Sequence, residues 1–376
     1  MARAVAAFTT LPPLAVRTPA VPAARCGWTP PARLVRGVTP SRVCPVSAGG
    51  FAAAAAAHRR SSGGGAPRMD AGSEGAVILC PGQGAQAVGM ASAWADASPD
   101  AAAVLARADA ALGTSLPGGV PLSTLMREGP KATLDRTDVA QPAIFVASMA
   151  ALAGARETGV LPPTGGVAAT AGLSLGEYTA LTVAGSLTFD DALRLVTLRG
   201  QAMQEAAEAS DGGMLALVGA SEEMATAIVD AVVAEMGAET VLVAANFNAP
   251  GQVVLSGSTA AIARAEVVAK APPFKLRRAI VLDVAGAFHS PLMAPAAARL
   301  AAALADVPIA APAVPVMANV AAAAHGDSPD GIRDALVAQL TSPVRWAACC
   351  EALAADEALG GGASGWSSRR ARRLGG

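Results

Sequence analysis

Short apolar runs alternate with longer helical patterns over most of the chain. Two of these runs, Ala76–Cys80 and Val167–Gly172, predict buried strands bounded by turn residues. Helical patterns follow them over four stretches: 90–112, 131–156, 175–185 and 190–209. Apolar strands that lead into helices are typical of a parallel α/β layer.

The rhythm changes near residue 213. Strands are predicted at 214–219, 241–246, 252–256 and 278–285, and helices at 222–236 and 258–270. Their order, strand-helix-strand-strand-helix-strand, is the ferredoxin-like split pattern. We therefore expect a compact ferredoxin-like subdomain over residues 210–286, inserted in a larger α/β domain.

The first rhythm returns after the insert, with a helix predicted at 291–305, a strand at 314–318 and a helix at 331–340. The larger domain should thus consist of residues 75–209 and 287–346. From Ala347 the sequence is rich in glycine and arginine and indicates neither a strand nor a packed helix. Residues 347–376 are expected to form an atypical tail.

Composition excludes several classes of protein. The 376 residues are 53% apolar, 15% charged and 3% aromatic, which fits neither a disordered chain nor a collagen nor a coiled coil. No run of about 18 uninterrupted apolar residues occurs, so no membrane span is expected. The five cysteines include no C-x-x-C pair and no Cys/His spacing typical of a metal site, so we expect neither a disulfide framework nor a bound metal.

The net charge of −1 hides an uneven distribution. Residues 1–69 contain nine of the 28 basic residues and none of the 29 acidic ones, so the remainder carries −10. An arginine-containing, acid-free, Ala- and Ser-rich leader is typical of an organelle transit peptide, predicted over residues 1–70 without ordered structure. Frequent Pro and Ser favour a plastid over a mitochondrion, and the alternative is a disordered tail without an address. The near-zero net charge of the whole chain argues against a nucleic-acid-binding protein.

One motif carries nucleophilic chemistry. Gly172-Leu-Ser174-Leu-Gly176 fits G-x-S-x-G between a predicted strand and a predicted helix. A sharp turn there needs small neighbours, and the N–H groups of the following helix favour developing negative charge. Taken alone, the motif also arises by chance in a glycine-rich chain.

A serine nucleophile needs a base, and the chain contains three histidines. His58 belongs to the leader, and His325 is expected in an exposed loop. His289 lies after a predicted buried strand and before a helix, which suits a general base. Because histidine is so scarce in this chain, a catalytic role for His289 is favoured over a merely structural one.

The loop Pro81-Gly-Gln83-Gly-Ala-Gln86 follows the first strand directly. No Gly-Lys-Ser/Thr follows, so it is not a P-loop, and Ala87 occupies the third glycine position of a dinucleotide fingerprint. Such a turn can present backbone N–H groups to an oxyanion, although an ordinary turn has the same composition.

Six motifs in order give the chain a family resemblance. They are 81–86 (PGQGAQ), 172–178 (GLSLGEY), 198–200 (LRG), 248–250 (NAP), 287–289 (AFH) and 339–343 (QLTSP). Together they resemble the malonyl-coenzyme A:acyl carrier protein transacylases of type II fatty acid synthesis, whose fold also serves as the acyltransferase domain of polyketide and animal fatty acid synthases. The resemblance spans about residues 75–346. It implies an α/β-hydrolase-like domain with an inserted ferredoxin-like subdomain.

The resemblance also implies roles for eight residues. Ser174 would be the nucleophile and His289 the base, oriented by a backbone carbonyl near Gln339 instead of an acid. The backbone N–H groups of Gln83 and Leu175 would form the oxyanion hole. Arg199 would bind the malonate carboxylate, whose two oxygens suit a guanidinium fork, and the pocket would be lined by Gln141, Phe288 and Gln339.

Two positions in this family resemblance bear on substrate and compartment. Phe288 resembles the malonyl-selective A-F-H pattern, in which a bulky ring excludes a methyl branch. Leu173 replaces the histidine of many bacterial members and matches plastid ones. The family's Gly-Pro-Gly-containing strand segment is missing after the Gln339 region, which motivates the hypothesis of a mispredicted or frameshifted C-terminus.

The implied partners are malonyl-CoA and acyl carrier protein, with no metal or redox cofactor, no nucleic acid and a monomeric enzyme. Acyl carrier proteins are acidic, and five basic residues are candidates for their contact surface: Lys270, Lys275, Arg277, Arg278 and Arg345. Two alternatives share these motifs. One is a serine esterase or thioesterase with the same elbow, and the other is an inactive scaffold that binds carrier protein.

Overall fold

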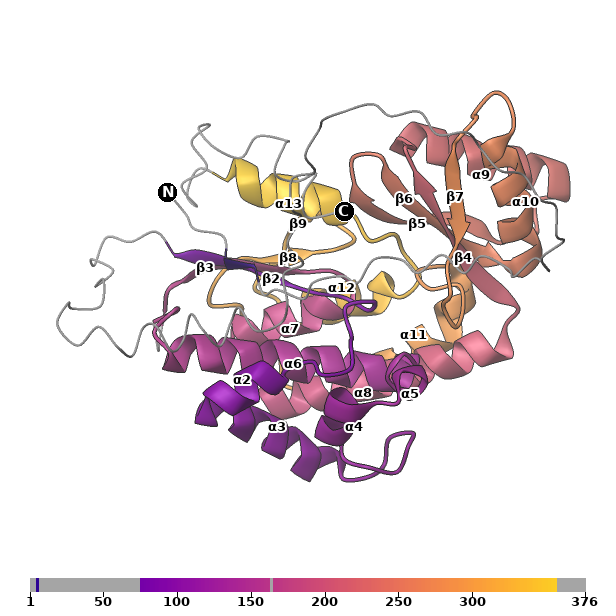
Figure 1. The fold of residues 1–376 in the computed structure, drawn as a ribbon. Coiled ribbons are helices and arrows are strands. Elements are labelled where there is room, and N and C mark those ends of the chain that lie inside the picture. Colours follow the sequence, from indigo (N-terminus) through magenta and orange to yellow (C-terminus); the bar gives the residue numbers. More distant parts are fainter. Residues whose placement is uncertain (1–4, 7–74, 163–164, 357–376) are drawn as a thin grey trace, which may run out of the picture. The chain divides into compact units, whose positions relative to one another are not determined.

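The computed structural model describes residues 5–6, 75–162 and 165–356 (Figure 1). Strand β1 (Val5–Ala6) is therefore the only described part of the predicted leader. The rest of the leader and residues 357–376 of the predicted tail lie outside the described residues.

The larger sheet is mainly parallel. Its order is β1, β2 (Ala76–Cys80), β3 (Val167–Gly172), β8 (Val316–Ala318) and β9 (Ala323–Ala324), and only β9 runs antiparallel to its neighbour. Both predicted central strands have the bounds expected, and their ends align because Cys80 is opposite Gly172. The loops after β2, β3 and β8 therefore leave the same edge of the sheet, where sites in such folds form.

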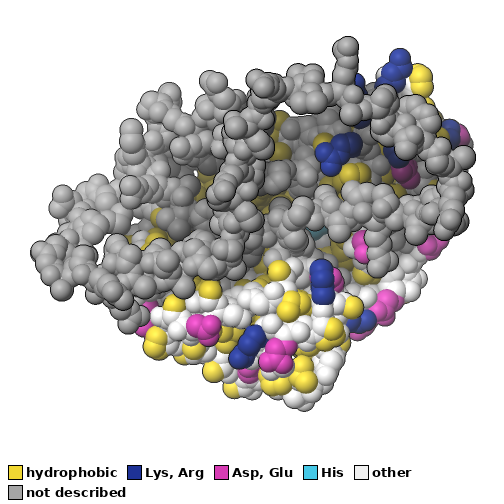
Figure 2. All heavy atoms as spheres, viewed as in Figure 1, with side chains coloured by type: hydrophobic (Ala, Val, Ile, Leu, Met, Phe, Trp, Pro, Cys, Tyr) yellow, Lys and Arg dark blue, Asp and Glu magenta, His cyan; other side chains and the backbone are white. Residues whose placement is uncertain are grey.

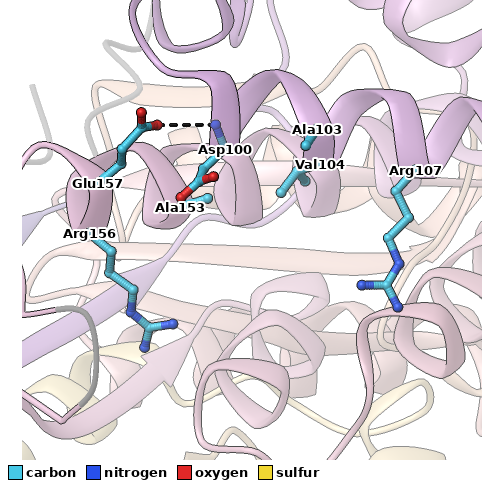
Figure 3. A pocket seen from close by; sticks show the side chains of 7 residues that line it. All are labelled: Asp100, Ala103, Val104, Arg107, Ala153, Arg156 and Glu157. Carbon is cyan, nitrogen blue, oxygen red and sulfur yellow. Dashed lines mark hydrogen bonds between the residues drawn. The ribbon is translucent and has the colours of Figure 1, made fainter.

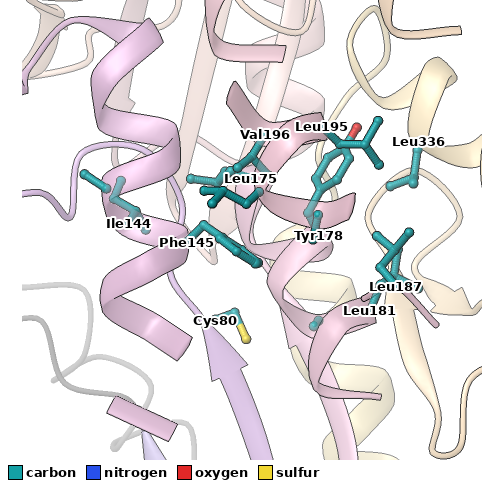
Figure 4. Packing of buried hydrophobic residues seen from close by; sticks show 14 of the residues in the cluster. Cys80, Ile144, Phe145, Leu175, Tyr178, Leu181, Leu187, Leu195, Val196 and Leu336 are labelled. Carbon is teal, nitrogen blue, oxygen red and sulfur yellow. The ribbon is translucent and has the colours of Figure 1, made fainter. Parts of the chain in front are cut away.

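Helices pack on this sheet (Figure 1), and all of them except α13 contribute to one large apolar core. Their bounds are α2 Ser92–Ala97, α3 Pro99–Leu112, α4 Leu122–Glu128, α5 Lys131–Leu134, α6 Thr137–Glu157, α7 Leu175–Val183, α8 Phe189–Ala209, the 3₁₀ turn η1 Pro291–Met293, α11 Ala294–Ala305, α12 Pro329–Gln339 and α13 Trp346–Ala355. In Figure 4, Phe145 of α6, Tyr178 of α7 and Val196 of α8 lie in the same cluster. Helix α7 is thus fixed between the sheet and the long helices α6 and α8.

Two predicted helices are broken in the structure. The stretch 90–112 forms α2 and α3, because Ser98 has extended backbone and its Oγ caps α3 by accepting from Ala101 N at 3.0 Å. Pro99, at the first position of α3, ends the preceding pattern. The stretch 131–156 likewise forms α5 and α6.

Helix α6 is the one helix of the described ranges that is long and apolar enough to cross a membrane. The rest of the protein buries 72% of its most apolar window, and its residues Val139, Phe145 and Val146 belong to the main core. Its composition is therefore that of a helix packed at the centre of the domain.

The second sheet confirms the ferredoxin-like subdomain. Its elements are β4 (Gly212–Val218), α9 (Glu222–Met236), β5 (Leu242–Ala249), β6 (Gln252–Ser258), α10 (Thr259–Lys270) and β7 (Arg278–Val281). The sheet is antiparallel with the order β5-β6-β4-β7, and α9 and α10 contribute to a separate apolar core. Strand β7 ends four residues before the predicted end at residue 285.

A short segment joins this subdomain to the larger sheet. Phe247 N donates to Val344 O and Val344 N donates to Ala245 O, both at 2.9 Å, so the segment before α13 extends the edge at β5. The next residue, Arg345, donates its N–H to Asn319 O at 2.9 Å, just beyond β8. The two sheets are therefore linked beside the carboxyl ends of the parallel strands.

The prediction that no packed helix follows Ala347 is wrong for residues 347–355. These residues belong to α13, where Cys349 and Leu353 lie one turn apart and are buried against Ala169, Ala171 and Met317. A ten-residue helix of mostly small residues shows little amphipathic contrast, so its contact face could not be recognised from the sequence.

Candidate active site

Ser174 occupies the sharp turn between β3 and α7. Its backbone has φ 52° and ψ −102°, a combination that is strained for any residue with a side chain. The turn closes because two glycines face each other: a Cβ on Gly172 would lie 1.9 Å from the carbonyl oxygen of Gly176. A Cβ on Gly176 would lie 2.3 Å from Cys80 O. The motif therefore aims the serine hydroxyl away from the sheet.

His289 lies directly against that hydroxyl. Its Nε2 is 2.9 Å from Ser174 Oγ, and its Nδ1 is 2.8 Å from the carbonyl oxygen of Gln339. Because a carbonyl only accepts, Nδ1 carries the proton and Nε2 presents its lone pair to the serine. His289 has φ 57°, so its backbone is also in the left-handed region. The structure thus brings together the two residues expected to form the reacting pair.

Burial keeps His289 uncharged. Desolvation is the largest effect on its pKa and the charge of Arg199 is the next, and together they lower it to about 4. The bond from Nδ1 to Gln339 O opposes the shift but does not cancel it. At neutral pH the imidazole can therefore accept a proton from Ser174.

Arg199, on α8, is a buried cation at the same point. Its side chain is among the largest fully buried ones, with the residue 1% exposed. Nη2 donates to Ser174 Oγ at 2.9 Å and to Gln339 Oε1 at 2.8 Å, and Nη1 donates to Gln141 Oε1 at 2.8 Å. The guanidinium also lies 5.4 Å from the centre of the Tyr178 ring. A fixed positive charge next to a nucleophile suits a substrate that carries a carboxylate.

The pKa of Arg199 is lowered from its ordinary value, chiefly by burial, while Tyr178 and Glu177 oppose that shift. Arginine starts from so high a pKa that it stays charged in proteins. The charge that lowers the pKa of His289 is therefore permanent.

The two candidate oxyanion donors border the elbow. Leu175 opens α7, so its backbone N–H has no acceptor within the helix. The loop that carries Gln83 follows β2, whose last residue, Cys80, accepts from Leu173 N of the elbow at 3.1 Å. The Gln83 side chain donates to Thr137 Oγ1 at 3.3 Å, which ties this loop to α6.

The two other pocket candidates differ in their surroundings. Gln141 is fully buried, and besides accepting from Arg199 it directs its Nε2 to Met203 Sδ at 3.3 Å. Phe288 is 6% exposed and belongs to the main apolar core, next to His289 in the sequence. Of these two, Gln141 is in direct contact with the charged group.

Two further residues of this site were not singled out by the sequence. Asn319 Oδ1 accepts from Ser174 N at 2.6 Å, and its Nδ2 donates to Gly172 O at 2.7 Å, so it clamps both sides of the elbow. Glu177 is a buried carboxylate one turn into α7. The signal for Asn319 was its place after β8, since the ends of neighbouring parallel strands meet at one edge.

The prediction of an exposed loop for His325 is wrong. Its side chain is 2% exposed, and Nε2 lies 2.7 Å from Glu177 Oε1. The reason is the short strand β9, which turns back along β8 so that His325 N donates to Val316 O at 2.8 Å. An alanine-rich run gave no periodicity from which this return could be predicted.

A surface pocket of about 590 Å³ lies elsewhere, between α3 and α6 (Figure 3). It is lined by Asp100, Ala103, Val104, Arg107, Ala153, Arg156 and Glu157. None of these is a nucleophile or a histidine, and Arg107 is paired with Asp190 at 2.8 Å. Nor do the described ranges contain a group of three or more His, Cys, Asp or Glu side chains that could hold a metal ion.

Comparison with known proteins places this geometry in a family. A family model described as the acyl transferase domain matches residues 77–361, three quarters of the chain. The chain belongs to the acyl transferase domain family. Among relatives of this acyl transferase, the malonyl CoA-acyl carrier protein transacylase of Salmonella typhimurium is 41% identical over 279 residues, covering 74% of this chain and 85% of that protein. The human mitochondrial malonyl-CoA-acyl carrier protein transacylase is 38% identical over 276 residues, covering 72% and 67%.

Solved structures of acyl transferases have the same fold. An acyl-carrier-protein-S-malonyltransferase from Bartonella henselae matches with a TM-score of 0.68 and 38% identity, covering 75% of this chain and 85% of that one. A malonyl-transacylase in complex with its type II polyketide synthase acyl-carrier protein matches with a TM-score of 0.66 and 36% identity, covering 74% and 84%. The mixed α/β fold with its ferredoxin-like subdomain is therefore confirmed.

Proposed function

We propose that the protein transfers the malonyl group from malonyl-CoA to the phosphopantetheine thiol of acyl carrier protein, as an S-malonyltransferase that supplies fatty acid elongation. The observation that carries the proposal is the position of Ser174 Oγ, 2.9 Å from both His289 Nε2 and Arg199 Nη2. A base and a carboxylate-binding cation on one hydroxyl suit an acyl group that ends in a carboxylate. The names of the relatives support the same substrates.

In the first half-reaction, His289 Nε2 takes the proton as Ser174 Oγ attacks the thioester carbonyl. The tetrahedral oxyanion is stabilised by the backbone N–H groups of Leu175 and Gln83. The carbon–sulfur bond then breaks, and the coenzyme A sulfur leaves with the proton from His289. The product is a malonyl ester on Ser174.

In the second half-reaction, His289 takes the proton of the phosphopantetheine thiol, and the sulfur attacks the same ester carbonyl. The oxyanion forms again at the same donors, the bond to Ser174 Oγ breaks, and Oγ recovers the proton from His289. Each step is acid–base and acyl chemistry, so the proposal includes no metal or redox cofactor.

Arg199 supplies the choice of substrate in this scheme. The malonyl carboxylate would accept from the guanidinium through two parallel bonds, with Gln141 and Gln339 fixing the plane of the fork. Phe288 would limit the space beside the acyl group and so exclude a methyl branch. A serine esterase or thioesterase acting on neutral esters has no use for this cation.

The acyl carrier protein would dock on exposed basic residues, most of them in the ferredoxin-like subdomain. Five candidates are exposed: Lys270, Lys275, Arg277, Arg278 and Arg345. On the face in Figure 2, the described acidic and basic side chains are interspersed over the helical part instead of forming one field. A local basic group in the subdomain is therefore the expected contact for an acidic partner.

The leader would direct the protein to a plastid, where it would act as a monomer in the stroma, with the mitochondrion as the alternative destination. The support is the composition of residues 1–70, in which arginine is frequent and acidic residues are confined to Asp70. Expression of that segment fused to a fluorescent protein tests the destination.

A transfer assay tests the activity. The protein is mixed with labelled malonyl-CoA and holo-acyl carrier protein, and malonyl-carrier protein and free malonate are measured separately. The proposal predicts that the carrier protein receives the label in large excess over water. Predominant release of malonate would favour the hydrolase alternative, and no turnover would favour the inactive scaffold.

A further inference from the structure

A buried histidine–carboxylate pair lies close to the nucleophile, with its carboxylate on the helix that follows the nucleophile. Glu177, one turn after Ser174 on α7, is 1% exposed, and none of the steps proposed above uses it. Its Oε1 lies 2.7 Å from His325 Nε2. Its Oε2 accepts from Asn319 N at 3.1 Å and from Gln339 Nε2 at 2.6 Å. A buried carboxylate with three donors is a satisfied centre that can fix the orientation of each of them.

The contact with Gln339 decides which way its amide points. Nε2 donates to Glu177 Oε2 and, at 3.0 Å, to Ser174 O, so the other end, Oε1, faces Arg199 and accepts from Nη2. Only a carbonyl oxygen there can accept from a guanidinium. The carboxylate of Glu177, together with Ser174 O, thus orients Gln339 so that it offers Arg199 an acceptor.

Gln339 also contacts the base, because its backbone carbonyl oxygen accepts from His289 Nδ1 at 2.8 Å. This bond also excludes Glu177 as the acid of a catalytic triad with His289. The ring nitrogen that an acid of a catalytic triad would contact is already bonded to Gln339, and Glu177 contacts a different histidine.

We infer that Glu177, oriented by His325, is a positioning residue that sets the selectivity for carboxylated acyl groups by fixing the amide of Gln339 against Arg199. This inference rests on the proposed malonyl transfer. Without the carboxylate, Gln339 Nε2 keeps only Ser174 O as an acceptor, so the amide is held less firmly. The acceptor that holds the plane of Arg199 is then less well fixed, and the binding of a malonyl carboxylate weakens more than that of a neutral acetyl group.

Two variants of Glu177 separate hydrogen-bond geometry from mere filling of space. In Glu177→Gln, the new amide oxygen can accept from Asn319 N and Gln339 Nε2, while its NH₂ donates to His325 Nε2 in the other tautomer. Glu177→Leu has a similar size and no acceptor. We expect the first variant to keep wild-type selectivity within about threefold and the second to lose it.

The readout is the ratio of kcat/KM for Ser174 acylation by malonyl-CoA to that by acetyl-CoA, measured by mass spectrometry of the quenched protein. A change in the folded fraction multiplies both rates equally, so the ratio reports positioning and not stability. Glu177→Leu should lower the ratio about tenfold, which corresponds to about 1.4 kcal/mol. A ratio unchanged in Glu177→Leu would overturn the inference.

A matched control is available in Glu157, whose carboxylate accepts from Ser98 Oγ and Asp100 N at the surface pocket of Figure 3. Glu157→Leu should leave the ratio unchanged, and a fall equal to that of Glu177→Leu would overturn the inference. If Glu177→Leu does not fold, His325→Leu takes its place, because it removes one of the three donors to Glu177. A fall of about threefold in the malonyl-to-acetyl ratio supports the inference, and an unchanged ratio contradicts it.

Failure of this inference differs from failure of the proposed function. If the wild-type protein acquires no malonyl group, the malonyl transfer itself is wrong, and the inference falls with it. If the wild type is malonylated and prefers malonyl to acetyl, only the ratio in the Glu177 and His325 variants decides.

Discussion

The hydroxyl of Ser174 lies between two groups that act on it in different ways. His289 Nε2 can take its proton, and Arg199 Nη2 donates a hydrogen bond to its oxygen. Burial and, second to it, the same guanidinium lower the pKa of His289 and favour the neutral form that a base requires. The proposed recognition of a carboxylate and the neutral state of the base are therefore coupled through the charge of Arg199.

This coupling predicts the pH dependence of Ser174 acylation. With its pKa lowered to about 4, His289 remains deprotonated above that pH, so kcat/KM for a neutral ester such as p-nitrophenyl acetate should fall only near pH 4. In Arg199→Ala the imidazolium no longer meets a positive charge, and the midpoint should move upward, toward the ordinary value of 6.5. Burst kinetics over pH 3.5–8 measure both. A wild-type midpoint near 6.5, or one that Arg199→Ala leaves in place, would contradict the coupling.

A second prediction concerns the shape of the cation. Arg199→Lys keeps the charge but cannot form two parallel bonds to a carboxylate, so kcat/KM for malonyl-CoA should fall about ten- to hundredfold. The rate with acetyl-CoA should change far less. Arg107→Lys is the control, because Arg107 also makes a two-pronged contact, with Asp190, but at an exposed position. Equal losses in the two variants would argue against a specific role for Arg199.

At the residue scale, the sequence predicted the side chains with unmistakable chemistry and missed those that position them. A serine in an elbow, a scarce histidine and an arginine in a matched motif were all recognisable. The clamp by Asn319 and the centre at Glu177 depend on contacts across about 140 residues of sequence, between α7 and the segment after β8. No local pattern encodes such a contact, and the burial of His325 was predicted wrongly for the same reason.

The elbow is the element that converts this chemistry into geometry. It depends on backbone segments that approach more closely than any side chain permits, at Gly172 and at Gly176. The strained backbone of Ser174 persists because Asn319 accepts from its N–H. Precise placement of the hydroxyl thus rests on local packing.

Gly176→Ala should disrupt the elbow. Its Cβ would lie 2.3 Å from Cys80 O, a backbone atom of a core strand that cannot move aside cheaply. We expect a loss of about 1–3 kcal/mol in the free energy of unfolding and a larger loss in Ser174 labelling. Gly213→Ala is the control, because nothing lies within 4 Å of its Cβ position. Chemical denaturation measures the first effect, and wild-type stability and labelling in Gly176→Ala would refute the packing argument.

The next prediction concerns helix α13, which covers one face of the parallel sheet with few side chains. Each of those side chains should therefore matter to stability. Leu353 is 8% exposed against the buried alanines of β3, so Leu353→Ala should lower the free energy of unfolding by about 2 kcal/mol. Val267→Ala, at a position 55% exposed, should change it by less than about 0.5 kcal/mol. Equal effects in urea denaturation would show that α13 does not cover the sheet.

At the element scale, strongly patterned segments were predicted well and weakly patterned ones were not. The strands Ala76–Cys80 and Val167–Gly172 and the order of the ferredoxin-like elements follow from contrast between apolar runs and turn residues. Two features that were not predicted, the helix break at Ser98 and the helix α13, both lie in alanine-rich sequence. Alanine suits both buried and exposed positions, so it carries little information on which face is packed.

At the scale of the whole molecule, the reacting serine lies where the two sheets are linked. Val344 pairs with β5 while the next residue, Arg345, bonds to Asn319 beside the elbow. The proposed contact residues Arg277 and Arg278 lie at the start of β7, which is the opposite edge of that sheet from β5. Because residues 70–376 are acidic overall, local basic residues are the proposed contact for an acidic carrier protein.

Reversal of that charge should affect only the second half-reaction. The double variant Arg277→Glu and Arg278→Glu is expected to raise KM for acyl carrier protein about three- to tenfold, because repulsion slows encounter with an acidic partner. The rate of Ser174 acylation by malonyl-CoA should stay within about twofold of the wild-type rate. Arg264→Glu, in the same subdomain but paired with Glu235, is the control. An unchanged KM in the double variant would place the carrier protein elsewhere.

The central claim is that Ser174 carries the malonyl group between the two substrates, and one measurement tests it most directly. The protein is incubated with malonyl-CoA, quenched in acid, digested and analysed by mass spectrometry, with and without later addition of holo-acyl carrier protein. The account predicts a malonyl ester on the peptide that contains Ser174, which disappears as malonyl-carrier protein forms. No adduct, an adduct on another residue, or an adduct that only water removes would contradict it.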